Sequence, residues 1–269
     1  MPTTYTMSNR LPDPDYTYGY WGQGGSTDAT ADAGPGFSSV KLTSDQKIMV
    51  SRTNSQRVLA KAVAGQKWKI DIGYHPMTQD EFRPIDAFLQ ARQGALNPFF
   101  VALPQYNNPK NQYWKDALTG RTGITGSSGA NSAFVFSAQA VQLAGATSVL
   151  IGSDNWTTTT YGGTGSEATS LPRPGEMFTI TDSNDTNHTK AYMITHVETA
   201  DKYVTGTTAP TTARLRLGIS PPLAKDVSTS GTFNFLNPLF KVILPNAIRS
   251  YSLNTNNLYK FSLKLEEYL

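Results

Sequence analysis

The chain has 269 residues, of which 38% are hydrophobic and 16% charged, enough for one large or two small domains with packed cores. It contains no cysteine, which excludes disulfides, thiolate chemistry and cysteine-ligated zinc. The net charge is only +3 with dispersed basic residues, and no apolar run reaches the roughly 20 residues of a membrane helix, so neither nucleic-acid recognition nor membrane insertion is indicated.

Residues 1–40 are rich in Gly, Asp, Ala and Thr and carry a cluster of aromatic side chains. The start of the chain lacks the apolar core of a secretory signal, so we expect a protein made and assembled in a cytoplasm. Two interpretations of this segment stay open, a poorly ordered tail and an arm that contacts a neighbouring subunit. The second would explain the cluster, because exposed aromatic rings gain nothing in a solvated tail. The candidate contact residues are Tyr16, Tyr18, Tyr20 and Trp21.

Two strands are predicted next, at Lys47–Val50 and Gln66–Tyr74. The second alternates apolar and charged side chains with a period of two, which is typical of a half-exposed strand in an antiparallel sheet. The residues between them could extend both strands into one long hairpin. The apolar face of the second strand comprises Trp68, Ile70, Ile72 and Tyr74.

A helix follows this strand. Thr78 and Glu81 match a capping box, and Gly94 is placed to end the helix. Pro84 would then lie several residues inside, so an alternative start near Pro84 stays open. The apolar stripe that we expect to pack the helix on a sheet comprises Phe82, Ile85, Phe88 and Leu89. Residues 98–103 (PFFVAL) then predict a buried strand.

The amino-acid composition changes between residues 107 and 236, where Gly, Thr and Ser dominate and short strand-like segments recur without helical periodicity. This spacing predicts a small closed β-barrel or sandwich. The predicted strands are Ala133–Phe136, Ala140–Leu143, Ser148–Ile151, Met177–Thr181, Ala191–His196, Arg214–Ile219 and Thr232–Phe235.

Strong strand patterns return at residues 240–244 (FKVIL) and 258–269 (LYKFSLKLEEYL). The last strand alternates like the 66–74 strand and is expected to be its partner in one sheet. The predicted organisation is therefore an arm over 1–40, a domain formed by 41–106 plus 237–269, and an inserted domain over 107–236.

No metal or cofactor site is predicted. The three histidines, His75, His188 and His196, form no spaced ligand pair. The segment 182–187 (DSNDTN) has the alternating oxygen donors of a calcium loop, but it lacks the required Gly and the terminal bidentate Glu. A polar hairpin tip is the favoured interpretation of this segment.

Two functional alternatives concern the inserted domain. Trp156 and Tyr161 could stack on sugar rings in a carbohydrate-binding adhesin, although the favoured interpretation is that Trp156 plugs the end of the barrel. A polysaccharide hydrolase would need a pair of carboxylates in a cleft. The local candidates Glu167, Glu176 and Asp182 are not spaced on one surface, so the sequence indicates that the protein is not an enzyme.

The succession of WKIDIGYHP, the helix EFRPIDAFLQARQG, an FF-containing strand and the terminal YKFSLKLEEY resembles the minor tail proteins of long-tailed bacteriophages. The lambda-type minor tail protein M family and distal-tail or baseplate ring proteins share this pattern. The resemblance covers roughly residues 45–104 and 238–269. The insert, with RPGEMFTI, KAYMITHV and LRLGISPPLA, resembles small β-barrels of tail-hub proteins and departs from the basic family pattern.

The resemblance implies a mainly β fold: a tail-tube-like β-sandwich with one packing helix, interrupted by an inserted β-barrel. It implies a structural virion protein at the tail tip or baseplate, without catalytic activity or cofactor. The expected assembly is a homo-oligomeric ring, most simply a hexamer, that joins the tail tube protein to hub or baseplate proteins. DNA would pass through the ring without sequence-specific binding, and the insert would project outwards.

Overall fold

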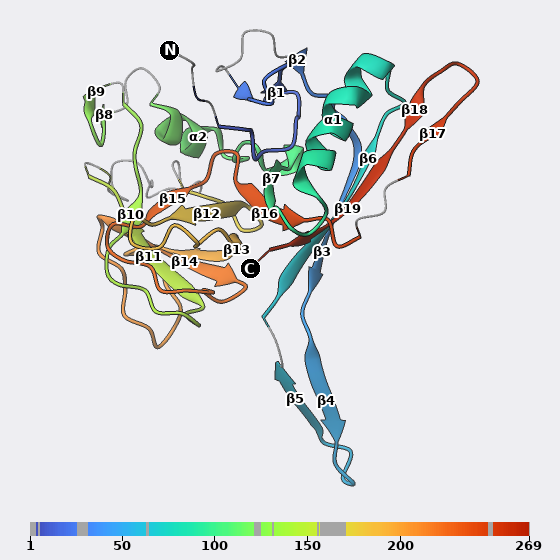
Figure 1. The fold of residues 1–269 in the computed structure, drawn as a ribbon. Helices are drawn as coiled ribbons and strands as arrows, with labels where there is room; N and C mark the ends of the chain where they lie inside the picture. The colour runs from blue at the N-terminus through green and yellow to red at the C-terminus, as the bar shows by residue number, and fades with distance from the viewer. Residues whose placement is uncertain are drawn as a thin grey trace. The chain divides into compact units, whose positions relative to one another are not determined.

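The computed structural model describes residues 4, 6–25, 32–62, 65–120, 125–130, 132–154, 156, 171–246 and 250–268. The chain is mainly β, with several sheets, two α-helices and one closed barrel among the described residues, which confirms the predicted fold class (Figure 1). The chain divides into two compact units. The first comprises Met1–Ala102 with Phe240–Leu269, and the second Leu103–Leu239.

The first unit is built on a five-stranded sheet. Its strands in spatial order are β3 (Phe37–Asp45), β6 (Lys67–Tyr74), β19 (Ser262–Glu267), β16 (Leu239–Ile243) and β7 (Phe99–Ala102). β6 pairs antiparallel with both β3 and β19, so the C-terminal strand is indeed the partner of the 66–74 strand. The alternation in β6 puts its apolar residues on the buried face because successive side chains point to opposite sides of a sheet.

Helix α1 (Gln79–Arg92) covers this unit on the apolar side. Glu81 Oε2 accepts hydrogen bonds from the Thr78 backbone N–H and hydroxyl, both at 2.8 Å, and these bonds lower the pKa of Glu81. The helix therefore begins at Gln79, and the alternative start near Pro84 is wrong because the cap at Thr78 already secures the first turn. Its buried residues are the predicted stripe Phe82, Ile85, Phe88 and Leu89.

The aromatic rings of α1 contact neighbouring strands at both ends of the helix. Phe82 stacks on Tyr259 of β18 with ring centroids 4.6 Å apart, and Phe88 meets Phe99 of β7 edge to face at 5.4 Å. Such contacts add to area burial. β18 (Tyr259–Lys260) pairs with β17 (Ser252–Leu253) in a short hairpin that precedes β19.

The described part of residues 1–40 is packed on the first unit, which corrects the interpretation as a poorly ordered tail. Leu11 is 1% exposed, its N–H donates to the Phe100 carbonyl at 2.8 Å, and the Phe100 N–H donates to Asn9 at 2.7 Å. This segment thus covers the outer edge of β7. The short strands β1 (Thr17–Tyr18) and β2 (Asp32–Ala33) pair antiparallel with each other. Strand β3 begins at Phe37, within the range that was assigned to the arm.

The predicted long hairpin is confirmed. β3 and β6 pair along their length, and the chain between them forms β4 (Ile48–Arg52) and β5 (Val58–Ala62), which pair antiparallel beyond the sheet. Figure 1 shows this two-stranded tip extending away from the five strands. Gln56 has a left-handed φ of 62° in the turn that joins β4 to β5.

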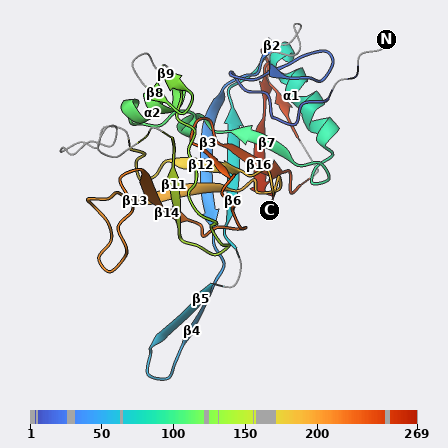
Figure 2. The same cartoon turned by 90° about the vertical axis from the view of Figure 1, so that its left-hand side faces the viewer.

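The second unit is a closed antiparallel barrel (Figure 2). Its strands in order around the barrel are β10 (Ser137–Ala138), β11 (Ser148–Gly152), β14 (Arg214–Ser220), β13 (Ala191–Glu198), β12 (Met177–Thr181) and β15 (Thr232–Asn234). Two predicted strands are wrong. No strand occurs at Ala133–Phe136, and Ala140–Leu143 contributes one isolated bridge from Gln142 to Val227.

A second helix, α2 (Gln112–Thr119), was not predicted. The Asn111 side chain caps it by accepting from the Tyr113 N–H at 3.1 Å, and Gly120 ends it with a left-handed φ of 73°. Trp114 is fully buried, with its ring centroid 4.7 Å from that of Phe136. Eight residues span only two turns, so the apolar period was too short to stand out from the strand-like surroundings. The 3₁₀ turn η2 (Pro104–Tyr106) and the hairpin β8–β9 (Thr125–Gly126, Gly129–Ala130) complete this unit.

The calcium-like segment is a turn held by hydrogen bonds within the protein. Asp182 is 2% exposed and accepts from the Ser228 N–H at 2.7 Å, the Ser228 hydroxyl at 2.8 Å and the Asn184 N–H at 2.9 Å. Burial raises the pKa of Asp182, but the three hydrogen bonds outweigh it and the pKa lies below 3.8. Asp182 therefore ties the turn after β12 to the segment before β15.

Candidate assembly interface and ligand pocket

One long edge of the five-stranded sheet is unpaired within the described chain. The order of strands ends at β3, which has nine residues, whereas β7 at the other end is covered by residues 9–11. An edge strand presents a row of backbone N–H and C=O groups that another strand can pair with. β3 is therefore a candidate site for sheet extension.

The tip ribbon formed by β4 and β5 carries exposed apolar side chains on both faces, with Met49 and Leu59 on one face and three aliphatic residues on the other. Val50 lies opposite Ala60, and Ile48 and Val58 lie on the same side of the ribbon because cross-strand partners share a face. Ile48, Val50 and Val58 are 54%, 63% and 54% exposed. Such a concentration of aliphatic side chains on a two-stranded ribbon is typical of a surface that a partner covers, because an isolated ribbon is marginally stable in water.

The four aromatic residues predicted to contact a neighbour fall into two pairs. The Arg10 guanidinium lies over the Tyr16 ring, 4.7 Å from its centroid. The Tyr18 ring packs edge to face on Phe88 of α1, with the ring centroids 5.8 Å apart. These two rings are half-buried against their own unit. Tyr20 and Trp21 are 89% and 60% exposed. Of the four predicted contact residues, these two are the ones whose side chains a neighbouring subunit could reach.

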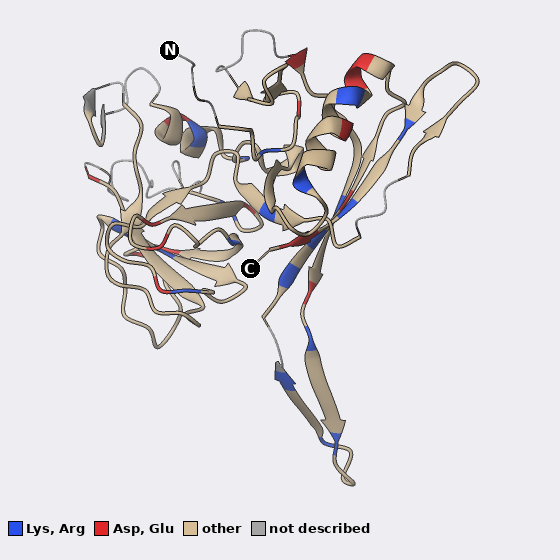
Figure 3. Cartoon of the chain, in the orientation of Figure 1, with Lys and Arg blue, Asp and Glu red and all other residues tan. Residues whose placement is uncertain are grey.

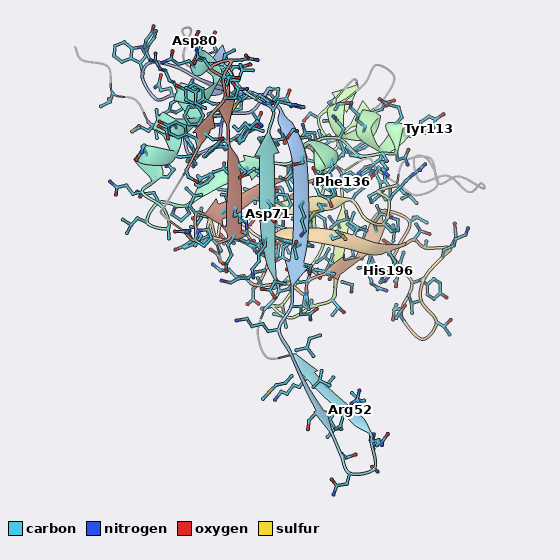
Figure 4. The ribbon with its side chains drawn as sticks, turned by 90° about the vertical axis from the view of Figure 1, so that its right-hand side faces the viewer. Arg52, Asp71, Asp80, Tyr113, Phe136 and His196 are labelled. Atoms are coloured by element: carbon cyan, nitrogen blue, oxygen red, sulfur yellow. The ribbon has the colours of Figure 1, made fainter. Side chains whose placement is uncertain are left out.

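The face of the sheet opposite α1 is polar and nearly balanced in charge. Lys69 contacts Asp45 at 2.6 Å and Lys67 contacts Glu266 at 3.0 Å, which links β3, β6 and β19 across their strands. The hydrogen bond from Lys69 lowers the pKa of Asp45. Figure 3 shows both signs of charge interspersed on these strands, and Figure 4 shows Asp71 of β6 among them.

The second unit has a pocket of about 500 Å³ beside β12. Tyr106 and Lys110 contribute from the segment before α2, Arg173 and Glu176 from the turn before β12, and the buried Phe235 from the end of β15. Glu176 joins the two segments, because Oε1 accepts from the Lys110 N–H at 2.8 Å and Oε2 from the Arg173 N–H at 3.1 Å. Burial raises the pKa of Tyr106.

The carbohydrate contact predicted at Trp156 is wrong. Trp156 is 1% exposed and lies in the barrel core, with its ring centroid 5.6 Å from that of Phe136 (labelled in Figure 4), so no face of the indole is free for a sugar. The sequence alternative, in which Trp156 fills the barrel, describes its position. Tyr161 lies outside the described residues.

Most of the remaining polar candidates have structural partners. His75 is exposed next to β6, the buried His188 hydrogen-bonds the Tyr192 hydroxyl at 2.8 Å, and His196 lies 3.5 Å from Glu198. Among the carboxylates considered for hydrolysis, Glu176 and Asp182 accept backbone hydrogen bonds and Glu167 lies outside the described residues. In the described part of the chain, no group of three His, Cys, Asp or Glu residues could hold a metal ion.

Sequence reasoning missed the pocket because its two halves are more than 60 residues apart in the chain. No helix among the described residues is long and apolar enough to cross a membrane.

Residues 26–106 match a family model described as the N-terminal part of the A domain of distal tail protein pb9. This segment holds β3, the tip ribbon, β6, α1 and β7, which are the elements that carry the sheet edge and the exposed ribbon. No match is found among curated proteins. The family match confirms the resemblance to phage distal tail proteins over these residues, and it supports a structural role in a phage tail.

Proposed function

Starting from the match of residues 26–106 to a phage distal tail domain, we propose that the protein forms a ring at the tail tip or baseplate. In this ring each subunit contacts its neighbours through β3, the tip ribbon and the exposed pair Tyr20 and Trp21. Closed cyclic symmetry would satisfy every edge, and six copies match the expectation from the resemblance. The ring would join the tail tube to hub or baseplate proteins and would have no catalytic role.

The observation that carries this proposal is the tip ribbon. Burying the exposed part of Ile48, Val50 and Val58 against a neighbour would contribute roughly 1 kcal/mol for each side chain, since full burial is worth roughly 1.5–3 kcal/mol and about half of each is already covered. The open edge of the nine-residue strand β3, at the base of the same hairpin, adds main-chain hydrogen bonds to the contact.

The balanced charge of the sheet face opposite α1 is consistent with passage of DNA. Lys41, Lys67, Lys69 and Lys264 share this face with Asp45, Asp71 and Glu266, as their strand register shows. A surface with interspersed charges of both signs binds phosphates weakly, because affinity for DNA depends on how many phosphates are neutralised. We propose that this face can border a channel without retaining DNA.

The ring is tested by measuring the mass of the purified full chain with light scattering and imaging it by electron microscopy. Replacing both Ile48 and Val50 by Glu should convert rings into monomers, because each contact would bury carboxylates without partners. The matched control replaces Val141 and Leu143, two exposed aliphatic residues of the second unit, by Glu. A wild-type chain that is monomeric both in solution and in labelled tails would refute the proposal, as would rings that survive the double substitution.

A further inference from the structure

The pocket beside β12 is lined by polar side chains that the protein itself leaves available. Among the described residues, the side-chain amides of Gln105 and Asn108 make no hydrogen bond, and neither Lys110 nor Arg173 makes a salt bridge. The two cations lie at the exposed rim. The carboxylate of Glu176 accepts backbone hydrogen bonds from Lys110 and Arg173, and among the described residues it makes no ion pair with the side chain of either.

The inner surface of the pocket is apolar and aromatic. Met177 and Phe235 are 2% and 3% exposed and form its floor, and the half-buried Tyr106 ring forms a wall. An aromatic wall suits the C–H face of a sugar ring, and side-chain amides suit its hydroxyls. The volume of about 500 Å³ lies within the usual range for small-molecule sites, about 300–1,000 Å³.

We propose that this pocket binds an anionic sugar unit, a saccharide that carries a carboxylate or a phosphate group. Arg173 and Lys110 hold the anion at the rim, Tyr106 packs against the sugar ring, and Gln105 and Asn108 bond its hydroxyls. This moves the carbohydrate hypothesis from Trp156, which is buried, to a surface that can receive a ligand. The inference does not depend on ring formation, because every lining residue belongs to the second unit.

The test titrates the full-length protein with four probes by calorimetry and ligand-observed NMR: glucuronate, glucose 6-phosphate, glucose and inorganic phosphate. At least one anionic sugar should bind about tenfold more tightly than glucose, the effect of one charge-assisted hydrogen bond of about 1.4 kcal/mol. It should also bind more tightly than inorganic phosphate, and its affinity should fall with added salt. The difference between glucuronate and glucose 6-phosphate identifies which anion is preferred.

Three variants locate the binding. Arg173→Met combined with Lys110→Met should abolish the preference for the anionic sugar over glucose, and Tyr106→Leu should weaken both sugars. Lys202→Met, an exposed lysine of the same unit outside the pocket, is the control and should bind like the wild type. Circular dichroism confirms that each variant is folded. Absence of binding by both anionic sugars, equal affinity for inorganic phosphate, or unchanged binding in the folded pocket variants would overturn the proposal.

Discussion

Replacing Asp182 by Ala should destabilise the barrel far more than the same change at Asp185, three residues away. Asp182 is buried and accepts three hydrogen bonds from Ser228 and Asn184. Each such bond to a charged acceptor is worth at least roughly 1.5 kcal/mol, which sets a scale of about 4–5 kcal/mol. Asp182→Ala also removes the cost of burying a carboxylate, which offsets part of the loss of these hydrogen bonds. We therefore expect the free energy of unfolding to fall by about 3 kcal/mol.

Asp185 provides the matched control. Its carboxylate contacts Lys225 at 3.1 Å with both side chains partly exposed, and such pairs contribute little because water screens them. Urea unfolding of the full chain, followed by tryptophan fluorescence, measures both variants against the wild type. Similar midpoints for Asp182→Ala and Asp185→Ala would refute the reasoning, since burial would then have no consequence at this turn.

The pH dependence of the Asp182 effect follows from its lowered pKa. The folded state holds the carboxylate ionised more firmly than the unfolded state, so the stabilisation is present above pH 3.8 and is lost as the pH falls below it. The gap between the wild type and Asp182→Ala should therefore be full at pH 6 and should narrow below pH 3.8. A gap that stays constant down to pH 2.5 would contradict the assignment of the stabilisation to the ionised form.

Three further predictions concern the barrel. Burial lowers the pKa of His188, so the unfolded chain takes up a proton below about pH 6.5 that the folded chain does not. The free energy of unfolding should therefore fall as the pH drops from 7 through this range. His188→Phe should reduce this pH dependence in unfolding titrations. The Glu198 carboxylate is 5% exposed and lies 2.7 Å from the Arg216 guanidinium. Arg216→Met leaves this buried carboxylate without the guanidinium and should lower the free energy of unfolding in urea by about 3 kcal/mol. Replacing both residues by Met should recover most of this loss. Trp156→Ala should cost about 3–5 kcal/mol as a core truncation, whereas an unchanged unfolding midpoint would show that the indole does not support the core.

Period and capping signals in the sequence predicted the first unit well. The alternation in Gln66–Tyr74 identified the buried face of β6, and the Thr78–Glu81 pair located the start of α1, because both signals depend on residues within one element. The complementary pattern at the C-terminus identified β19 as the partner of β6 across almost 200 residues. An element was missed where the local signal was weak: helix α2 was not predicted, because its two turns carry too few apolar positions to show a period.

Exposure could not be predicted from residue type. Trp156 as a sugar contact and Tyr18 as a subunit contact were candidates only, and one lies in the barrel core and the other against Phe88, because the burial of an aromatic side chain depends on which distant segments fold over it.

By itself, the sequence determined the mainly β class, the long hairpin and the packing face of α1, since these follow from side-chain alternation, periodicity and capping along a continuous stretch. Only the tertiary structure decided that β3 is an open edge, that the tip ribbon exposes apolar side chains, and that Tyr106 and Arg173 meet at one pocket. These features arise from strand order and from contacts between segments far apart in the chain, which no local pattern encodes.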